Sequence, residues 1–108
     1  MTVQQLIDAT PLTAVALPRP DKELAGVYIG DLLSWVMGKA EAADAWITIM
    51  SNQNIVAVAT LTDVACIVLA EGVEPDEGVA DLAAAKNVNI LSSPLGAYET
   101  ALVLRDCL

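Results

Sequence analysis

Short apolar runs alternate along the chain with polar segments that contain proline, glycine or asparagine. Runs rich in β-branched or aromatic residues predict strands at residues 12–17, 27–29, 46–50, 66–70 and 89–91. Elsewhere, apolar residues recur every three or four positions, as they do on one face of a helix. This spacing predicts helices over residues 2–9, 32–37, 55–64 and 75–83, and a last helix after Pro94.

Residues 55–64 carry conflicting signals. The segment is rich in β-branched residues, which favours a strand. However, Asn52 and Asn54 are good helix caps, and a crossover between parallel strands needs about a dozen residues, usually helical. We therefore predict a helix here. Two other helix starts have clear signals, because Asp31 stands at an N-cap position and Pro75 suits a first helical turn.

From residue 46 onward, strands and helices follow one another in strict alternation. This order predicts an α/β fold with a mainly parallel sheet and helices packed on it. The strands are apolar on both faces, as a sheet covered on both sides requires. The chain has 108 residues and no linker or low-complexity tract, so we expect one domain over residues 1–108.

Composition narrows the functional classes. The chain is 56% hydrophobic, carries a net charge of −9 and has no histidine. Its charge disfavours nucleic acid and anionic membrane surfaces as partners, and the missing histidine removes the commonest general base and metal ligand. The longest apolar stretch, residues 55–70, contains Asp63 and is too short for a membrane span, so we interpret it as core.

Polar residues follow four predicted strands, at the end where parallel sheets bind ligands. We therefore predict a ligand-binding site made of Gly30, Asp31, Ser51, Asn52, Gln53, Asn54, Gly72, Ser92 and Ser93. Three of the four segments directly precede a helix N-terminus, where free N–H groups favour polar ligands. As an alternative, Asp31, Asn54 and Ser93 serve only as helix caps. The segment Ser51–Asn54 has more polar side chains than one cap needs.

No catalytic, metal or cofactor motif is present. A phosphate-binding loop is absent, because Gly38-Lys39 is followed by alanine and lacks the first glycine. The acidic loop of residues 71–77 matches no calcium-binding spacing. Cys66 and Cys107 suit buried thiols in the cytoplasm. An enzyme would have to rely on Asp31, Glu71 or Cys66 as its reactive group.

Five segments together resemble the DRTGG domain family: Tyr28–Ser34, Trp46–Ile49, Asn54–Ala59, Gly72–Glu77 and Ile90–Leu95. The likeness covers residues 24–105 and implies a fold similar to the amino-terminal domain of HPr kinase/phosphorylase. It also implies a regulatory class, since such domains occur beside CBS domains, in phosphotransacetylases and as small proteins labelled serine kinases. Some accompany iron-hydrogenase gene clusters. The naming motif is absent, and the nearest stretch, Asp21–Gly26, has Lys22 in place of arginine.

Together these observations predict a non-catalytic regulatory domain in the cytoplasm. It would bind a small polar metabolite, nucleotide-like molecules included, at the carboxyl ends of the strands. The alternative is a dimerisation or protein-interaction module that accompanies a metabolic or iron-hydrogenase system. A homodimer is expected, because so small and apolar a chain with two tryptophans exposes more hydrophobic surface than monomers usually do.

Overall fold

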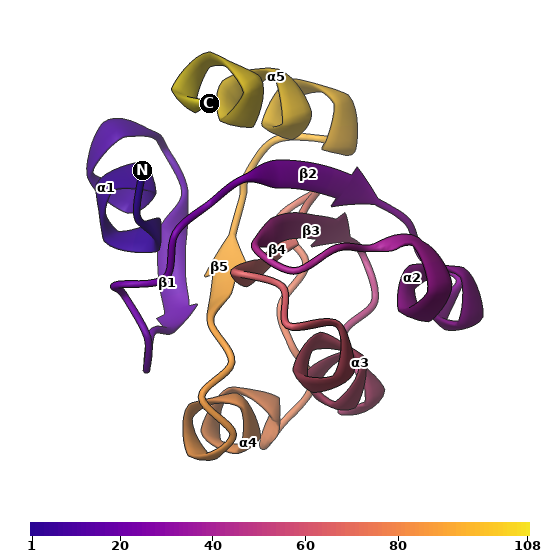
Figure 1. Cartoon of the computed structure of the whole chain (residues 1–108). Coiled ribbons are helices and arrows are strands. Elements are labelled where there is room, and N and C mark those ends of the chain that lie inside the picture. The colour runs from indigo at the N-terminus through magenta and orange to yellow at the C-terminus, as the bar shows by residue number, and fades with distance from the viewer.

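A five-stranded sheet with helices on both faces forms the molecule, and the computed structural model describes all residues, 1–108 (Figure 1). The elements in chain order are α1 (Val3–Ala9), β1 (Thr13–Ala16), β2 (Gly26–Ile29), α2 (Leu33–Lys39), β3 (Asp44–Thr48), α3 (Asn54–Thr62), β4 (Cys66–Leu69), α4 (Val79–Ala85), β5 (Ile90–Ser92) and α5 (Ala97–Cys107). This confirms the predicted mainly parallel α/β fold.

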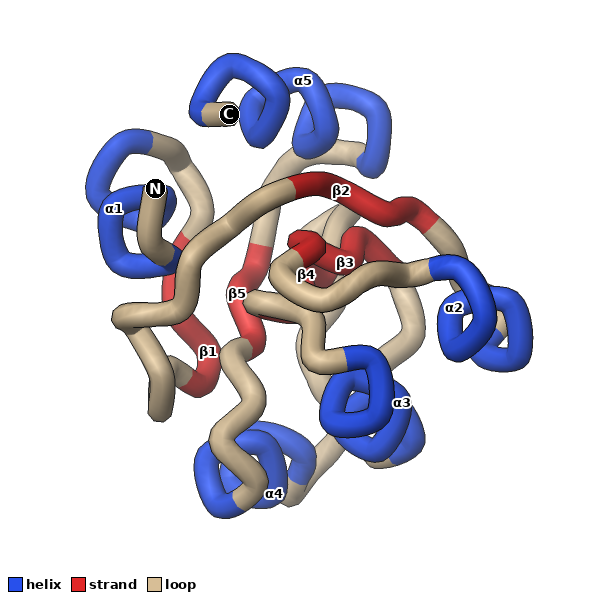
Figure 2. The backbone as a smooth tube through the Cα atoms, in the orientation of Figure 1, coloured by secondary structure: helices blue, strands red, loops and turns tan.

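The strand order is β1-β5-β4-β3-β2. Strands β2, β3, β4 and β5 run parallel to one another, whereas β1 pairs with β5 in the antiparallel sense. Consequently β1 and β2 form opposite edges of the sheet, and Figure 2 shows the long loop that connects them. The four parallel strands all end at the same border of the sheet, which runs across the strands from β1 to β2. We call the border at their carboxyl ends the carboxyl edge, and the border at their amino ends the amino edge.

Two hydrophobic clusters cover the two faces of the sheet. Helices α2, α3 and α4 pack on one face, around the buried Trp46 and Ile67. Helices α1 and α5 pack on the other face, where Leu6, Leu104 and Ile47 belong to one buried cluster. Because successive strand residues alternate between the faces, β3 supplies Trp46 to one cluster and Ile47 to the other. Burial on both sides explains the continuous apolar runs of the sequence.

Local signals placed most elements correctly. Thr2 caps α1 in a capping box with Gln5, and its hydroxyl accepts a 3.1 Å hydrogen bond from the Gln5 N–H. The ambiguous segment is helical, and α3 ends at Asp63, a residue in the left-handed conformation with φ of 57°. None of the five helices has the length and apolar character that crossing a membrane requires.

Several predicted boundaries are wrong, most clearly those of β3 and α4. Strand β3 runs from Asp44 to Thr48, two residues earlier than expected. Helix α4 begins at Val79, after Gly78 with φ of +85°, and Pro75 lies in the preceding loop. The backbone N–H of Asp76 donates to the Ser51 carbonyl at 2.9 Å, so this loop is fastened to the end of β3 instead of forming a helical turn.

Candidate functional site

The loops after the four parallel strands meet at the carboxyl edge, as the sequence predicted. The Gly72 N–H donates to the Ser93 carbonyl at 2.8 Å, which joins the loops after β4 and β5. The Gly30 N–H donates to the Ile47 carbonyl at 3.2 Å and holds the loop after β2 against β3. The nine predicted site residues therefore lie at the carboxyl edge, seven of them in the loops, with Asn54 as the first residue of α3 and Ser92 as the last residue of β5.

Asp31 has a different role from the predicted helix cap. Its Oδ1 atom accepts hydrogen bonds from the Thr48 hydroxyl at 2.7 Å and from the Ile49 N–H at 3.1 Å. The N-cap of α2 is Leu32, and no side chain caps this helix. Asp31 thus fastens the end of β2 to the end of β3, and its second oxygen, Oδ2, makes no hydrogen bond within the chain.

The segment Ser51–Asn54 combines bonded and free polar groups. The Ser51 hydroxyl donates to Asp76 Oδ1 at 2.8 Å, and Asn52 Oδ1 accepts from the Asn54 N–H at 2.9 Å. Asn52, and not the side chain of Asn54, therefore supports the start of α3. The Asn52 NH₂ group and the exposed side chains of Gln53 and Asn54 have no hydrogen-bond partner, so they remain open to a ligand.

The two serines after β5 are not equivalent. Ser93 is fully buried, its hydroxyl lies 2.7 Å from that of Thr100, and it accepts a hydrogen bond from the Leu95 N–H at 3.1 Å. These internal bonds make Ser93 a structural residue of the turn before α5, so it cannot be a ligand donor as its inclusion in the site assumed. Ser92 is partly exposed and its hydroxyl has no partner.

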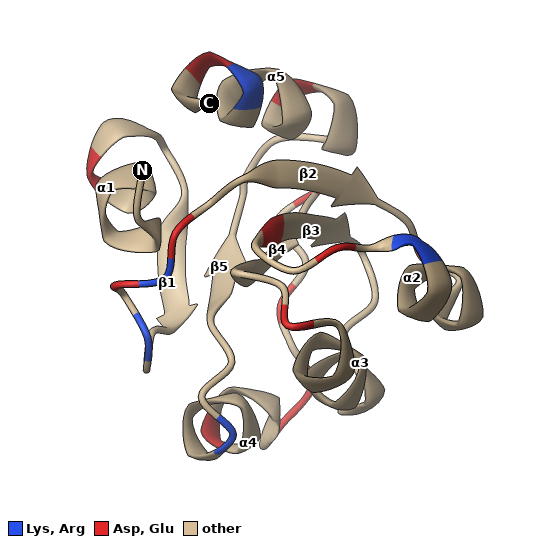
Figure 3. Cartoon of the chain, in the orientation of Figure 1, with Lys and Arg blue, Asp and Glu red and all other residues tan.

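Carboxylates dominate the charge of this edge. Asp31 and Asp76 lie within it, and the carboxylates of Glu71 and Glu99 lie beside Gly96. A Cβ atom at Gly96 would stand 2.7 Å from Glu71 Oε1 and 2.8 Å from Glu99 Oε2, so both carboxylates lie close to the start of α5. Figure 3 shows the few Lys and Arg residues on the β1–β2 connection, α2, the end of α4 and α5. The carboxyl edge is therefore negatively charged.

The hollows of the surface lie away from the predicted site. The largest, about 560 Å³, is an apolar groove between β2 and α5. A polar hollow of about 190 Å³ at the amino edge is lined by Arg19, Lys22 and Lys86. Lys22 Nζ donates there to Asp63 Oδ1 at 3.0 Å and to the Val64 carbonyl at 3.3 Å. These contacts place positive charge at the C-terminal end of α3, where the helix dipole favours it.

Sequence reasoning missed the apolar groove. A signal for it was present, because Tyr98 and Leu102 lie on α5 one helical turn apart.

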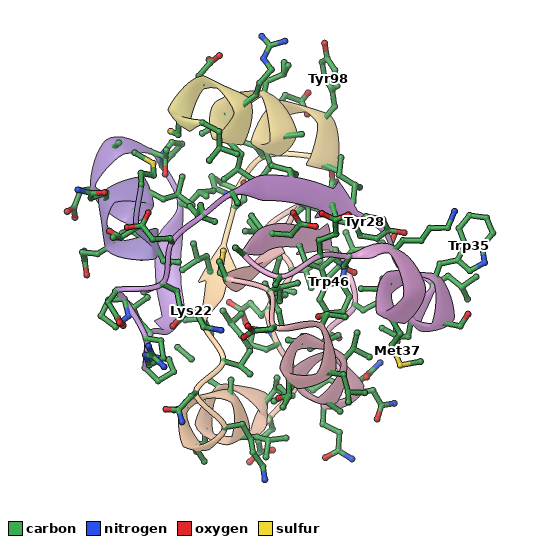
Figure 4. All side chains as sticks on the ribbon, in the orientation of Figure 1. Lys22, Tyr28, Trp35, Met37, Trp46 and Tyr98 are labelled. Atoms are coloured by element: carbon green, nitrogen blue, oxygen red, sulfur yellow. The ribbon has the colours of Figure 1, made fainter.

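The two tryptophans lie in different environments (Figure 4). Trp46 is fully buried and its Nε1–H donates to the Gly30 carbonyl at 2.8 Å. Trp35 is 58% exposed, with Lys39 Nζ 4.5 Å from its ring centroid.

Cys66 is not a nucleophile in the folded chain. Its thiol is completely buried, and desolvation raises its pKa to about 12, although the charge of Lys22 acts in the opposite direction. The reactive thiolate is therefore not formed near neutral pH. Of the three candidate reactive groups, Asp31, Glu71 and Cys66, only the two carboxylates are exposed.

Comparisons with known proteins agree with this fold. The family model for the DRTGG domain matches residues 21–107. A similar solved structure is the crystal structure of the CBS and DRTGG domains of the regulatory region of Clostridium perfringens pyrophosphatase, complexed with its activator diadenosine tetraphosphate. The TM-score is 0.73 at 15% identity, over 95% of this chain but only 45% of that one. The chain thus spans less than half of this neighbour's length. No curated protein matches the sequence.

Proposed function

The chain belongs to the DRTGG domain family, and on this basis we propose that it is a regulatory domain that senses a small polar metabolite at its carboxyl edge. The main support is the convergence there of the loops after β2, β3, β4 and β5, with unpartnered polar groups on Asn52, Gln53 and Ser92. The pyrophosphatase region of similar fold binds a nucleotide activator, which makes an adenine nucleoside a suitable first ligand. We place this activity in the cytoplasm.

The chemistry of the edge specifies the ligand further. The free groups are amide donors and acceptors, a serine hydroxyl and one carboxylate oxygen, and these match the hydrogen-bonding edge of a nucleobase. The neighbouring carboxylates repel phosphate. We therefore propose a neutral, donor-bearing ligand of nucleoside size, held mainly by its base.

No catalytic step is part of this proposal. The buried Cys66 thiol does not supply a nucleophile, and no phosphate-binding loop is present in the sequence. The proposed role is therefore ligand binding, and the effect of the ligand would pass to a protein that contacts the domain.

Titration of the ¹⁵N-labelled chain with adenosine, followed by NMR, tests the site directly. Saturable shifts are expected in residues 30–31, 51–54, 71–72 and 92. Ser92→Ala should weaken binding about tenfold, since one hydrogen bond is lost, and should leave stability unchanged because the hydroxyl has no partner in the fold. Asn52→Ala should weaken binding similarly but cost about 1 kcal/mol of stability, because Asn52 also supports α3.

Gln4→Ala on α1 is the matched control, since it removes an exposed amide far along the chain from the site. Adenosine shifts confined to other residues, or equal affinity of the Ser92→Ala variant and the parent chain, would contradict the proposed site. Diadenosine tetraphosphate serves as a second probe. If it bound much more tightly than adenosine at the same residues, the preference for a neutral ligand would be wrong.

We also propose that the chain forms a homodimer, and that its dimer can dock onto a metabolic enzyme. The supporting observation is the number of large apolar side chains that are half or more exposed: Ile29, Leu32, Trp35, Ile49, Leu61, Tyr98 and Leu108. Light scattering and sedimentation of the purified chain measure this. A mass of 11.3 kDa maintained at high micromolar concentration would contradict the homodimer.

A further inference from the structure

Strand β2 is an edge strand with an unprotected outer side. It pairs with β3 alone, and its sequence, Gly-Val-Tyr-Ile, contains neither a charge nor a proline. Natural sheets usually protect an open edge with charged residues, proline or a bulge. The opposite edge strand, β1, does have an irregular register, between Ala14 and Ala16. The outer side of β2 is therefore ready to pair with another strand.

Apolar side chains flank this open strand on both faces of the sheet. On the α5 side, the groove is lined by Ile29, Tyr98, Leu102 and Leu108, and its one charged residue is Arg105. On the α2 side, Leu32 and Trp35 are exposed by 59% and 58%. Figure 4 shows Tyr98 and Trp35 projecting into solvent from the two helices. We call Ile29, Leu32, Trp35, Tyr98 and Leu108, together with the β2 backbone, the β2 edge surface.

The size of this surface suits a dimer interface. Each of its five side chains is at least half exposed, with Tyr98 at 71%. An aromatic side chain has about 150–250 Å² to bury, so the five together expose on the order of 500 Å² of apolar area. A stable interface covers about 800 Å² per partner. The β2 backbone and the rims of α2 and α5 can supply the remainder.

We propose that a second copy of this chain covers the β2 edge surface, with the two β2 strands paired antiparallel across a two-fold axis. This inference rests on the proposed homodimer and locates its interface. A two-fold axis perpendicular to the sheet relates antiparallel strands and keeps equivalent helices on the same face. The α5 helices of the two copies then meet each other, as do the α2 helices, and the apolar side chains meet their own counterparts.

The charges of α5 fit the same arrangement. Glu99 and Arg105 lie three residues before and three residues after Leu102, which lines the groove. When two such helices cross antiparallel near Leu102, Arg105 of one copy approaches Glu99 of the other. Each interface then gains two opposite-charge contacts at its rim. Such contacts favour this orientation and register in a chain whose overall charge of −9 otherwise repels a second copy.

Two surface variants and one matched control test the interface by sedimentation over a concentration series. Ile29→Lys places a charge on the open strand, and Tyr98→Ser removes the most exposed aromatic residue of the groove. Both positions are exposed enough for the monomer to fold. Each variant should raise the dimer dissociation constant at least about tenfold. Leu61→Lys on α3 replaces an even more exposed apolar residue outside the surface and should leave the constant unchanged.

Hydrogen exchange at low and high protein concentration provides an independent measurement. The amides of β2 should exchange more slowly in the dimer, because strand pairing occupies the outward-facing groups. A wild-type chain that stays monomeric would refute the homodimer itself. A stable dimer that survives Ile29→Lys and Tyr98→Ser, or one whose slowed amides lie on α3 and not on β2, would refute this interface while leaving the homodimer intact.

Discussion

Replacing each tryptophan with phenylalanine should separate the two indole environments by their effects on stability. Trp46 is completely buried between β3 and the α2–α4 layer, and its N–H satisfies the Gly30 carbonyl at 2.8 Å. Trp46→Phe removes that donor and leaves a void where the larger ring stood. Trp35→Phe removes a ring that is 58% exposed and contacts Lys39.

The expected losses differ several-fold. The missing hydrogen bond at Gly30 costs about 1–3 kcal/mol, and the void adds about 1–2 kcal/mol, so Trp46→Phe should cost about 2–5 kcal/mol. This is a large share of the roughly 5–15 kcal/mol that stabilises a domain. Trp35→Phe should cost less than about 1 kcal/mol, the size of an exposed cation–π contact.

Urea unfolding followed by far-UV circular dichroism measures both changes. The comparison is best made in the Ile29→Lys background, because dimerisation would make apparent stability depend on concentration. Each variant also retains a single tryptophan. Emission from Trp46 alone should be blue-shifted and resistant to acrylamide, whereas emission from Trp35 alone should be quenched readily. Equal losses of stability for the two variants, or a loss below about 1 kcal/mol for Trp46→Phe, would refute the placement of Trp46 and its bond to Gly30.

Two further predictions concern Cys66 and Lys22. Burial raises the pKa of Cys66 to about 12, so iodoacetamide at pH 8 should modify only the partly exposed Cys107 in the native chain. In urea it should modify both cysteines. Modification of Cys66 in the native chain would contradict its burial. Because the folded chain favours the neutral thiol of Cys66, the free energy of unfolding should not depend on this group below pH 9.0. As the pH rises from 9.0 toward 12, the free energy of unfolding should fall by about 1.4 kcal/mol per pH unit, and urea midpoints should show this decrease. Lys22→Met removes the bonds of Nζ to Asp63 and to the Val64 carbonyl and should cost about 1–2 kcal/mol, whereas Lys39→Met should cost little; equal costs would refute the role of Lys22 at the end of α3.

Local signals were sufficient for most of the secondary structure. The capping box of Thr2 and Gln5 involves residues three positions apart, so the sequence contains the whole motif. The strands Cys66–Leu69 and Ile90–Ser92 were recognisable because both of their faces are buried and are therefore apolar. Parallel order alone also predicted that the loops after these strands share one edge of the sheet, where the candidate site lies.

Contacts between distant residues decided the details that were wrong. Asp31 was expected to cap α2, but its carboxylate bonds to Thr48 and Ile49, which come next to it only when β2 pairs with β3. Pro75 was expected to start α4, but Ser51 holds the neighbouring Asp76 through both its hydroxyl and its carbonyl. A capping residue and a long-range acceptor have the same side chain, so the sequence does not distinguish them.

The sequence by itself determined the α/β class, the parallel order of the strands and the edge at which polar groups collect, because each follows from local periodicity and chain direction. Only the tertiary structure decided which polar groups are free. It buries Ser93, whose hydroxyl is hydrogen-bonded to that of Thr100, and leaves the Ser92 hydroxyl without a partner. It also decided that β2 stands at the edge of the sheet. Strand order depends on which apolar faces pack together across the whole chain, and short four-residue strands carry too little pattern to specify their neighbours.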